Sequence, residues 1–187
     1  MDPGSFILFV SKAFPVLPWW HWMIMIVVAF CSALTLRKRR SLSVYATVSL
    51  ALTVSVGLFL VDGIVLDRLP SQQKFYSGLD LVTEYHRLIG CDEIQFNCML
   101  LNVMVFIPFG FFLFEYTSCA GKQTTLKNLK SVVISAFLLS MFIELAQWIL
   151  KVGYLELTDM VLNTIGAALG AALAMMGRVV AKSKSNV

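Results

Sequence analysis

Long apolar stretches constrain this chain more than any other feature of its sequence. A helix needs about 20 apolar residues to cross the hydrocarbon core of a bilayer, and the 187-residue chain contains five such stretches: Trp19–Leu36, Val44–Leu66, Phe96–Tyr116, Ser131–Leu150 and Thr158–Met176. Charged residues make up only 14% of the chain, whereas soluble domains carry about 25%. The sequence therefore predicts one all-α membrane domain over residues 1–187, a polytopic transmembrane helical bundle of about five spans.

The positions of the basic residues orient these spans. Of the 15 lysines and arginines, ten fall in connections on one side of the membrane and five on the other. Because basic connections stay in the cytoplasm, this distribution predicts an N-terminus outside the cell and a C-terminus in the cytoplasm. The run Arg37–Arg40 is the strongest signal, although such a run can also bind anionic lipid headgroups. A cleaved signal peptide is not expected, because no basic segment precedes the first apolar run.

The longest polar connection, residues 67–95, falls on the outer side. Within it Leu81, Tyr85 and Leu88 share one helical face, which predicts a short amphipathic helix on the outer surface. The four cysteines show no CxxC spacing, so neither a zinc site nor a redox pair is indicated. Cys91 and Cys98 could form a disulfide on an oxidising side, but we favour their use as small apolar residues.

Polar side chains recur at a similar depth in the last three spans. They are Asn102 in the third, Glu144 and Gln147 in the fourth, and Asp159 and Asn163 in the fifth. At the helical rise, Asn102, Glu144 and Asn163 would each lie about 7–10 Å inside the outer boundary. Amides alone could simply join the helices. A carboxylate inside a span is costly unless it is protonated, paired or hydrated, so Glu144 favours a functional site.

Glycine and proline predict how the last three spans pack. Pro108 and Gly110 predict a bend in the third span that widens the space between helices. Gly166 and Gly170 form, with the neighbouring alanines Ala167, Ala171 and Ala174, a small-residue face for close helix packing. That face is structural, and no chemistry is assigned to it.

These residues together resemble the VanZ-like family of bacterial membrane proteins. The resemblance rests on Asn102 with FIPFG, on Glu144 and Gln147 in IELAQ, and on Asp159 with LNTIGAALG, and it covers about residues 97–174. It implies a multi-pass protein of the bacterial plasma membrane, without a cofactor, linked to teicoplanin resistance. By position, it makes the same residues candidates for a binding site: Asn102, Glu144, Gln147, Asp159 and Asn163.

Among the departures of the chain from the family pattern, one concerns a positive charge. Members commonly carry a basic residue just ahead of the last span, where this chain has Gly153 and Tyr154. The resemblance then implies that the positive charge comes from Arg87 or Lys151, or that the ligand differs. We therefore include Arg87 among the candidate binding residues.

Three functions remain open. We favour a non-catalytic envelope protein that binds membrane lipids and a lipid-linked cell-wall precursor or lipoglycopeptide near the outer leaflet. The alternative is a membrane enzyme in which Glu144 and Asp159 act as general acid and base or hold a metal ion, with His86 or Arg87 binding a phosphate. A transporter or channel is less supported, because the spans lack symmetric halves. Nucleic-acid binding is not supported, because the basic residues are scattered between spans. The oligomeric state stays open.

Overall fold

The computed structural model describes residues 19–40, 42–64, 77–78, 93–121, 124–151 and 155–184. Several predictions lie outside the described residues. These are the amphipathic helix within residues 67–95, the placement of Arg87 and His86, and Cys91, whose bridge to Cys98 therefore stays a prediction.

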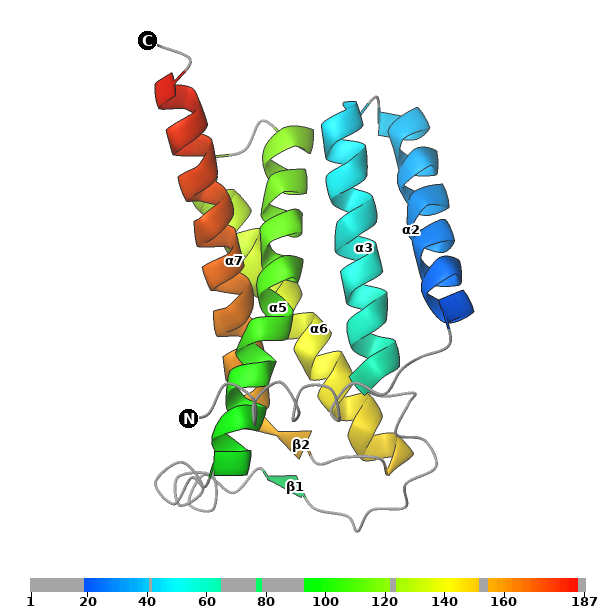
Figure 1. Cartoon of the computed structure of the whole chain (residues 1–187), viewed down its shortest axis with the longest axis vertical. Coiled ribbons are helices and arrows are strands. Elements are labelled where there is room, and N and C mark those ends of the chain that lie inside the picture. Colours follow the sequence, from blue (N-terminus) through cyan, green and yellow to red (C-terminus); the bar gives the residue numbers. More distant parts are fainter. Residues whose placement is uncertain are drawn as a thin grey trace.

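The described residues form five helices and two very short strands (Figure 1). The elements are α2 (Trp19–Arg40), α3 (Val44–Ile64), β1 (Ser77–Gly78), α5 (Glu93–Ala120), α6 (Thr125–Leu150), β2 (Leu155–Glu156) and α7 (Leu157–Lys184). Helices α3, α5, α6 and α7 are long and apolar enough to cross a membrane. This confirms the predicted helical membrane fold. Helix α2 covers the predicted first span, whose crossing of the membrane stays a prediction.

The later helices extend beyond the spans predicted for them. Helix α6 begins at Thr125 rather than Ser131, and α7 continues to Lys184 rather than Met176. Hydropathy marks the residues that the hydrocarbon core tolerates, whereas the helices continue into the headgroup region, where long basic side chains reach water. Five basic residues of these two helices that were expected in connections are therefore helical: Lys127, Lys130, Arg178, Lys182 and Lys184.

The helices alternate in direction along the bundle (Figure 1). Helices α2, α5 and α7 run one way, and α3 and α6 run the other. The α2–α3 connection, the α5–α6 connection and the end of α7 therefore share one end, which we call the basic end after its residues Arg37, Lys38, Lys127, Lys130 and Arg178. The opposite end, with β1, β2 and the start of α7, is the strand end. Which end faces the cytoplasm stays a prediction.

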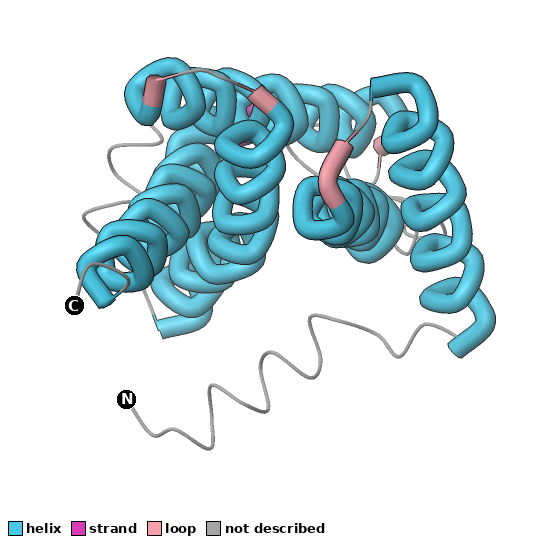
Figure 2. The backbone as a smooth tube through the Cα atoms, turned by 90° about the horizontal axis from the view of Figure 1, so that it is seen from above, coloured by secondary structure: helices cyan, strands magenta, loops and turns pink. Residues whose placement is uncertain are grey.

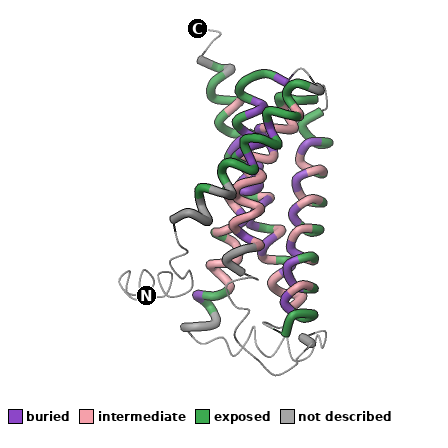
Figure 3. The backbone as a smooth tube through the Cα atoms, turned by 90° about the vertical axis from the view of Figure 1, so that its right-hand side faces the viewer, coloured by how far each residue is buried: buried purple, intermediate pink, exposed green. Residues whose placement is uncertain are grey.

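Helix α5 has the central position in the bundle. Viewed from the basic end, α3 lies on one side of α5 and α7 on the other, with α2 beyond α3 (Figure 2). Helix α6 crosses behind α5, from the side of α7 toward the side of α3 (Figure 1). Phe106 and Phe114 of α5 are buried in a core that they share with Leu60 of α3 and Ile143 of α6. Figure 3 shows that the buried residues follow the inner faces of the helices. A smaller core joins α2 to α3.

Glycines bring α5 and α7 into direct backbone contact. A Cβ at Gly166 would overlap the carbonyl oxygen of Val103, and one at Gly170 would overlap that of Ile107. The two residues of each pair are 63 positions apart, so the parallel helices keep one register. The predicted small-residue face is confirmed, because its alanines are also buried: Ala167, Ala171 and Ala174.

The sequence predicted that the space beside α5 is widened near Pro108 and Gly110, but at Gly110 the structure shows close packing instead. A Cβ at Gly110 would overlap the carbonyl oxygen of Ala167, so the residue serves close packing of α5 on α7. Helix α5 continues through Pro108, which is exposed. At Gly110 the predicted widening is therefore wrong, because the missing side chain lets the backbones approach. The predicted bend of the third span stays a prediction.

Candidate functional site

The polar side chains of α6 and α7 meet at Ser140 and Asn163. Asn163 Nδ2 donates a hydrogen bond of 2.8 Å to Ser140 Oγ, and both residues are buried. Each side chain lowers the cost of placing the other in the apolar interior. Ser140 was not among the predicted site residues. The available signal was its position one turn before Glu144, on the same face of α6.

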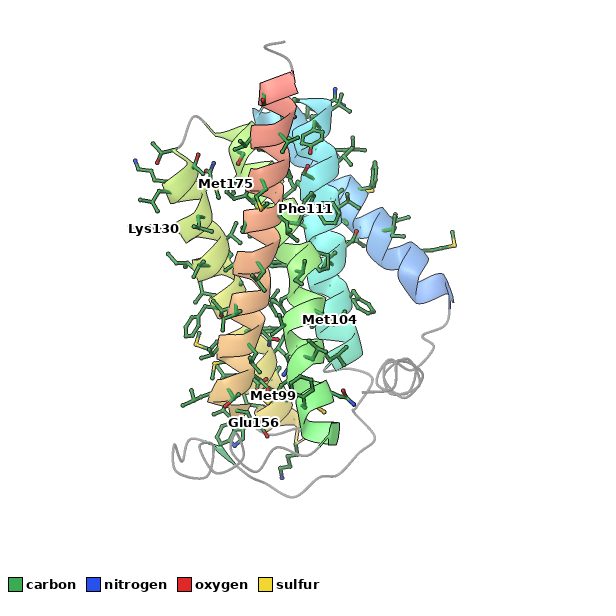
Figure 4. All side chains as sticks on the ribbon, turned by 60° about the vertical axis from the view of Figure 1, so that its left-hand side comes forward. Met99, Met104, Phe111, Lys130, Glu156 and Met175 are labelled. Atoms are coloured by element: carbon green, nitrogen blue, oxygen red, sulfur yellow. The ribbon has the colours of Figure 1, made fainter. Side chains whose placement is uncertain are left out.

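Glu144 points into the bundle and not toward lipid. It is 3% exposed, and its Oε2 accepts a hydrogen bond of 2.9 Å from the backbone N–H of Glu156. Glu156 ends β2 directly before α7, at the strand end (Figure 4). A carboxylate here is stabilised by the hydrogen bond and by the positive end of the α7 dipole. This contact explains how a span accommodates the carboxylate, and it holds the start of α7 against α6.

Asp159 lies on the same α6–α7 interface as Glu144. Because the two helices are antiparallel, one turn forward from Ser140 and one turn back from Asn163 lead in the same direction. These two steps end at Glu144 and Asp159. Gln147, three residues further along α6, is also buried. Glu144, Gln147 and Asp159 each make a further interaction. Because these residues share the α6–α7 interface with Ser140 and Asn163, we call the five residues the polar cluster.

The polar residues form two tiers rather than the single level that the sequence predicted. Ser140 and Asn163 form the inner tier, and Glu144 begins about 6 Å further along α6, nearer the strand end. The register of α5 and α7 places Asn102 within about 3 Å of the inner tier along the helix axis. The predicted depths differ from those in the structure because α6 extends beyond the start of α7 at the strand end.

Asn102 is half-buried. Among the described residues, its side chain makes no hydrogen bond to Glu144 or Asn163. Asn97 of α5, which the predicted site did not include, is buried at 4% exposure, and its Oδ1 accepts no hydrogen bond from the described part of the chain. The available signal was an amide at the mouth of the third span. Arg87 lies outside the described residues.

A second polar network, near the basic end, was also missed from the sequence. Glu115 of α5 is buried at 4% exposure and pairs with Arg178 of α7, whose Nη2 lies 2.7 Å from Oε2. The hydroxyl of Tyr45 on α3 donates to the same oxygen over 2.9 Å, and Arg178 Nη2 donates to Cys119 Sγ over 2.8 Å. The network joins α3, α5 and α7, and it accounts for a second carboxylate within a span.

The donor set at the strand end bears on the predicted metal alternative. Within the described ranges, no group of three or more His, Cys, Asp and Glu side chains is placed to hold a metal ion. Glu144 and Asp159 would therefore need amide, backbone or water oxygens to complete the coordination of a cation. Glu144 and Asp159 therefore fit a metal ion only if such additional oxygen ligands complete its coordination.

Comparison with known proteins identifies the family. No curated protein and no solved structure matches the chain. The model of the VanZ/LLP1 family matches residues 21–179, which contain both polar tiers and the network at the basic end. This match is longer than the range 97–174 that carried the predicted resemblance, because it reaches back through α3 into α2. The chain belongs to the VanZ/LLP1 family.

Proposed function

We propose that this protein contributes to resistance to the glycopeptide teicoplanin from the bacterial plasma membrane. It binds a lipid-linked cell-wall precursor or a lipoglycopeptide near the outer leaflet and catalyses no reaction on it. Family membership and four helices able to cross a membrane support the general part of the proposal, a VanZ-like membrane protein. The polar cluster at the strand end supports the binding part.

The observation that carries the proposal is the buried carboxylate of Glu144 in a helix able to cross the membrane. Ionisable groups at such depth are expensive, and inside membrane helices they are candidates for functional sites by default. A cluster of Glu144, Asp159, Gln147 and Asn163 therefore exceeds what helix association requires. It lies near the end of the bundle that the basic residues predict to be outside, where cell-wall precursors and glycopeptides are encountered.

The proposal is tested by teicoplanin susceptibility and by the amount of fluorescent teicoplanin bound to cells, with and without the gene. Expression should raise the inhibitory concentration and change the amount of bound drug, and Glu144→Ala should abolish both effects. Leu145→Ala, the next residue on α6 and an exposed one, is the matched control and should retain both. Unchanged susceptibility together with unchanged drug binding would rule the proposal out. Membrane levels of each variant are measured alongside.

The alternative is a membrane enzyme that modifies a lipid-linked envelope substrate, with Glu144 and Asp159 as acid and base or as metal ligands. It is favoured by the placement of both carboxylates on one helix interface, one turn from the Ser140–Asn163 bond. Glu144→Gln separates the two functions, because glutamine can still accept the hydrogen bond from Glu156 but can neither transfer a proton at pH 7 nor bind a cation as a carboxylate does. Full resistance in this variant supports binding, and a loss with normal membrane levels supports the enzyme.

A further inference from the structure

Two asparagine–serine pairs join neighbouring helices in this bundle. Asn163 Nδ2 of α7 donates to Ser140 Oγ of α6 over 2.8 Å, and Asn128 Nδ2 of α6 donates to Ser118 Oγ of α5 over 3.1 Å. In both pairs the asparagine is 3% exposed, and its Oδ1 accepts no hydrogen bond from the described residues. The two pairs therefore have the same chemistry and provide a comparison within one molecule.

The two pairs differ in their depth along the bundle. Asn128 lies in the first turn of α6, at the basic end, directly after four exposed residues, 124–127. Asn163 lies about 9 Å along α7 from its first residue, and Ser140 lies about 15 Å from the nearer end of α6. Lipid chains donate no hydrogen bonds, so a buried carbonyl oxygen at this depth carries its full desolvation cost unless something donates to it. An unsatisfied group of this kind calls for a specific explanation.

The hydroxyl hydrogen of Ser140 also has no acceptor among the described residues. In other helices of the bundle, Ser32, Thr53 and Thr164 each donate to the carbonyl four residues earlier. Ser140 makes no such bond within the described ranges, and its Oγ accepts from Asn163. The Ser140–Asn163 pair therefore presents one hydrogen-bond donor, the serine O–H, next to one acceptor, the asparagine Oδ1.

We propose that Ser140 and Asn163 form a binding subsite for a hydroxyl group in the interior of the bundle. A hydroxyl donates one hydrogen bond and accepts others, so it satisfies both open positions at once. A phosphate or carboxylate oxygen only accepts and would leave Asn163 Oδ1 unsatisfied, whereas an ammonium only donates and would leave the serine hydrogen without an acceptor. The hydroxyl comes from water or from the ligand of the proposed function. The second source rests on that function, and the first does not.

Water-edited solid-state NMR of the full chain in liposomes tests the subsite. With asparagine labelled with 15N, magnetisation transferred from water to each side-chain amide reports on a bound hydroxyl. Asn163 should receive transfer comparable to that of Asn128, the matched pair near the surface, and Ser140→Ala should reduce the Asn163 signal several-fold while leaving that of Asn128 unchanged. The Asn163 signal is assigned by its loss in Asn163→Leu or, should that variant fail to fold, by its displacement in Asn163→Gln.

Adding teicoplanin identifies the source of the hydroxyl. Transfer from water that persists identifies water as the occupant, and replacement of that transfer by contacts from protons of the drug identifies a ligand hydroxyl. No transfer to Asn163 in either state, with transfer to Asn128 present in the same sample, would overturn the proposed subsite. Transfer from water without any effect of the gene on teicoplanin susceptibility or binding would overturn the proposed function and leave the subsite standing.

Discussion

Replacing Glu144 separates its hydrogen bond from its charge. Glu144→Gln retains an oxygen that accepts from the backbone N–H of Glu156, 2.9 Å from the carboxylate in the native protein. It loses the charge, and charged hydrogen bonds exceed neutral ones by about 1 kcal/mol. Glu144→Ala also leaves the N–H of Glu156 without this acceptor, which adds about 1–3 kcal/mol. We therefore expect a loss in the free energy of unfolding of about 1 kcal/mol for glutamine and about 3 kcal/mol for alanine.

Equilibrium unfolding in mixed micelles, followed by circular dichroism, measures this series. The wild type should be most stable, then Glu144→Gln, then Glu144→Ala. Equal losses for the two variants would show that the hydrogen bond to Glu156 contributes nothing, and the interpretation of Glu144 as a stabiliser of the start of α7 would fall. Glu144→Ala with native stability would refute it more directly, since a 3% exposed carboxylate would then contribute nothing net to the fold.

Three further predictions concern packing, charge and orientation. Gly170→Leu should separate α5 from α7 and lower the free energy of unfolding by several kcal/mol, because the leucine side chain would meet the carbonyl of Ile107. Gly177→Leu, with open space around it, should be tolerated. Equal unfolding midpoints for the two variants would contradict the close packing of α5 on α7. Arg178→Ala should destabilise the protein by about 3–5 kcal/mol, because Glu115 would stay buried without its ion-pair partner. In the same unfolding assay, the double variant Glu115→Gln, Arg178→Gln should recover part of this loss. A double variant less stable than Arg178→Ala would show that the unpaired charge of Glu115 is not the cause. In a chain without the native cysteines, Lys151→Cys should react with a membrane-impermeant thiol reagent on intact cells, and Thr124→Cys should react only after permeabilisation. The reason is that the two exposed positions lie at opposite ends of the bundle. The reverse labelling pattern would show that the predicted orientation is inverted.

The presence of these helices was predictable, because a membrane helix depends on the hydrophobicity of about 20 consecutive residues. The second to fifth apolar stretches correspond to α3, α5, α6 and α7. The glycines of α7 lie at a close helix contact, as their spacing predicted, although the spacing did not identify α5 as the partner. The helix ends were less predictable. Lys127 and Arg178 end the hydropathy signal without ending the helix, because a long side chain lets the charge leave the apolar layer while the backbone stays hydrogen-bonded.

Which polar residues meet was only partly predictable. Burial of Glu144, Gln147 and Asn163 agrees with a polar interface, but their depths could not be compared by counting from span boundaries. That comparison needs the stagger of α6 against α7, which side-chain packing sets. The pairing of Glu115 with Arg178 depends in the same way on the register of α5 and α7, which Gly110, Gly166 and Gly170 allow by close backbone contact.

The sequence by itself determined that this chain is a bundle of membrane helices with its basic residues segregated. Within lipid, every backbone polar group must be bonded internally, and a long apolar stretch can do this only as a helix. Only the tertiary structure decided that Glu144 bonds the start of α7 and that Asn163 meets Ser140 one turn further in. Those contacts join residues 12 and 23 positions apart on different elements. Their distance is set by how two helices slide and rotate against each other, which no periodicity within one helix records.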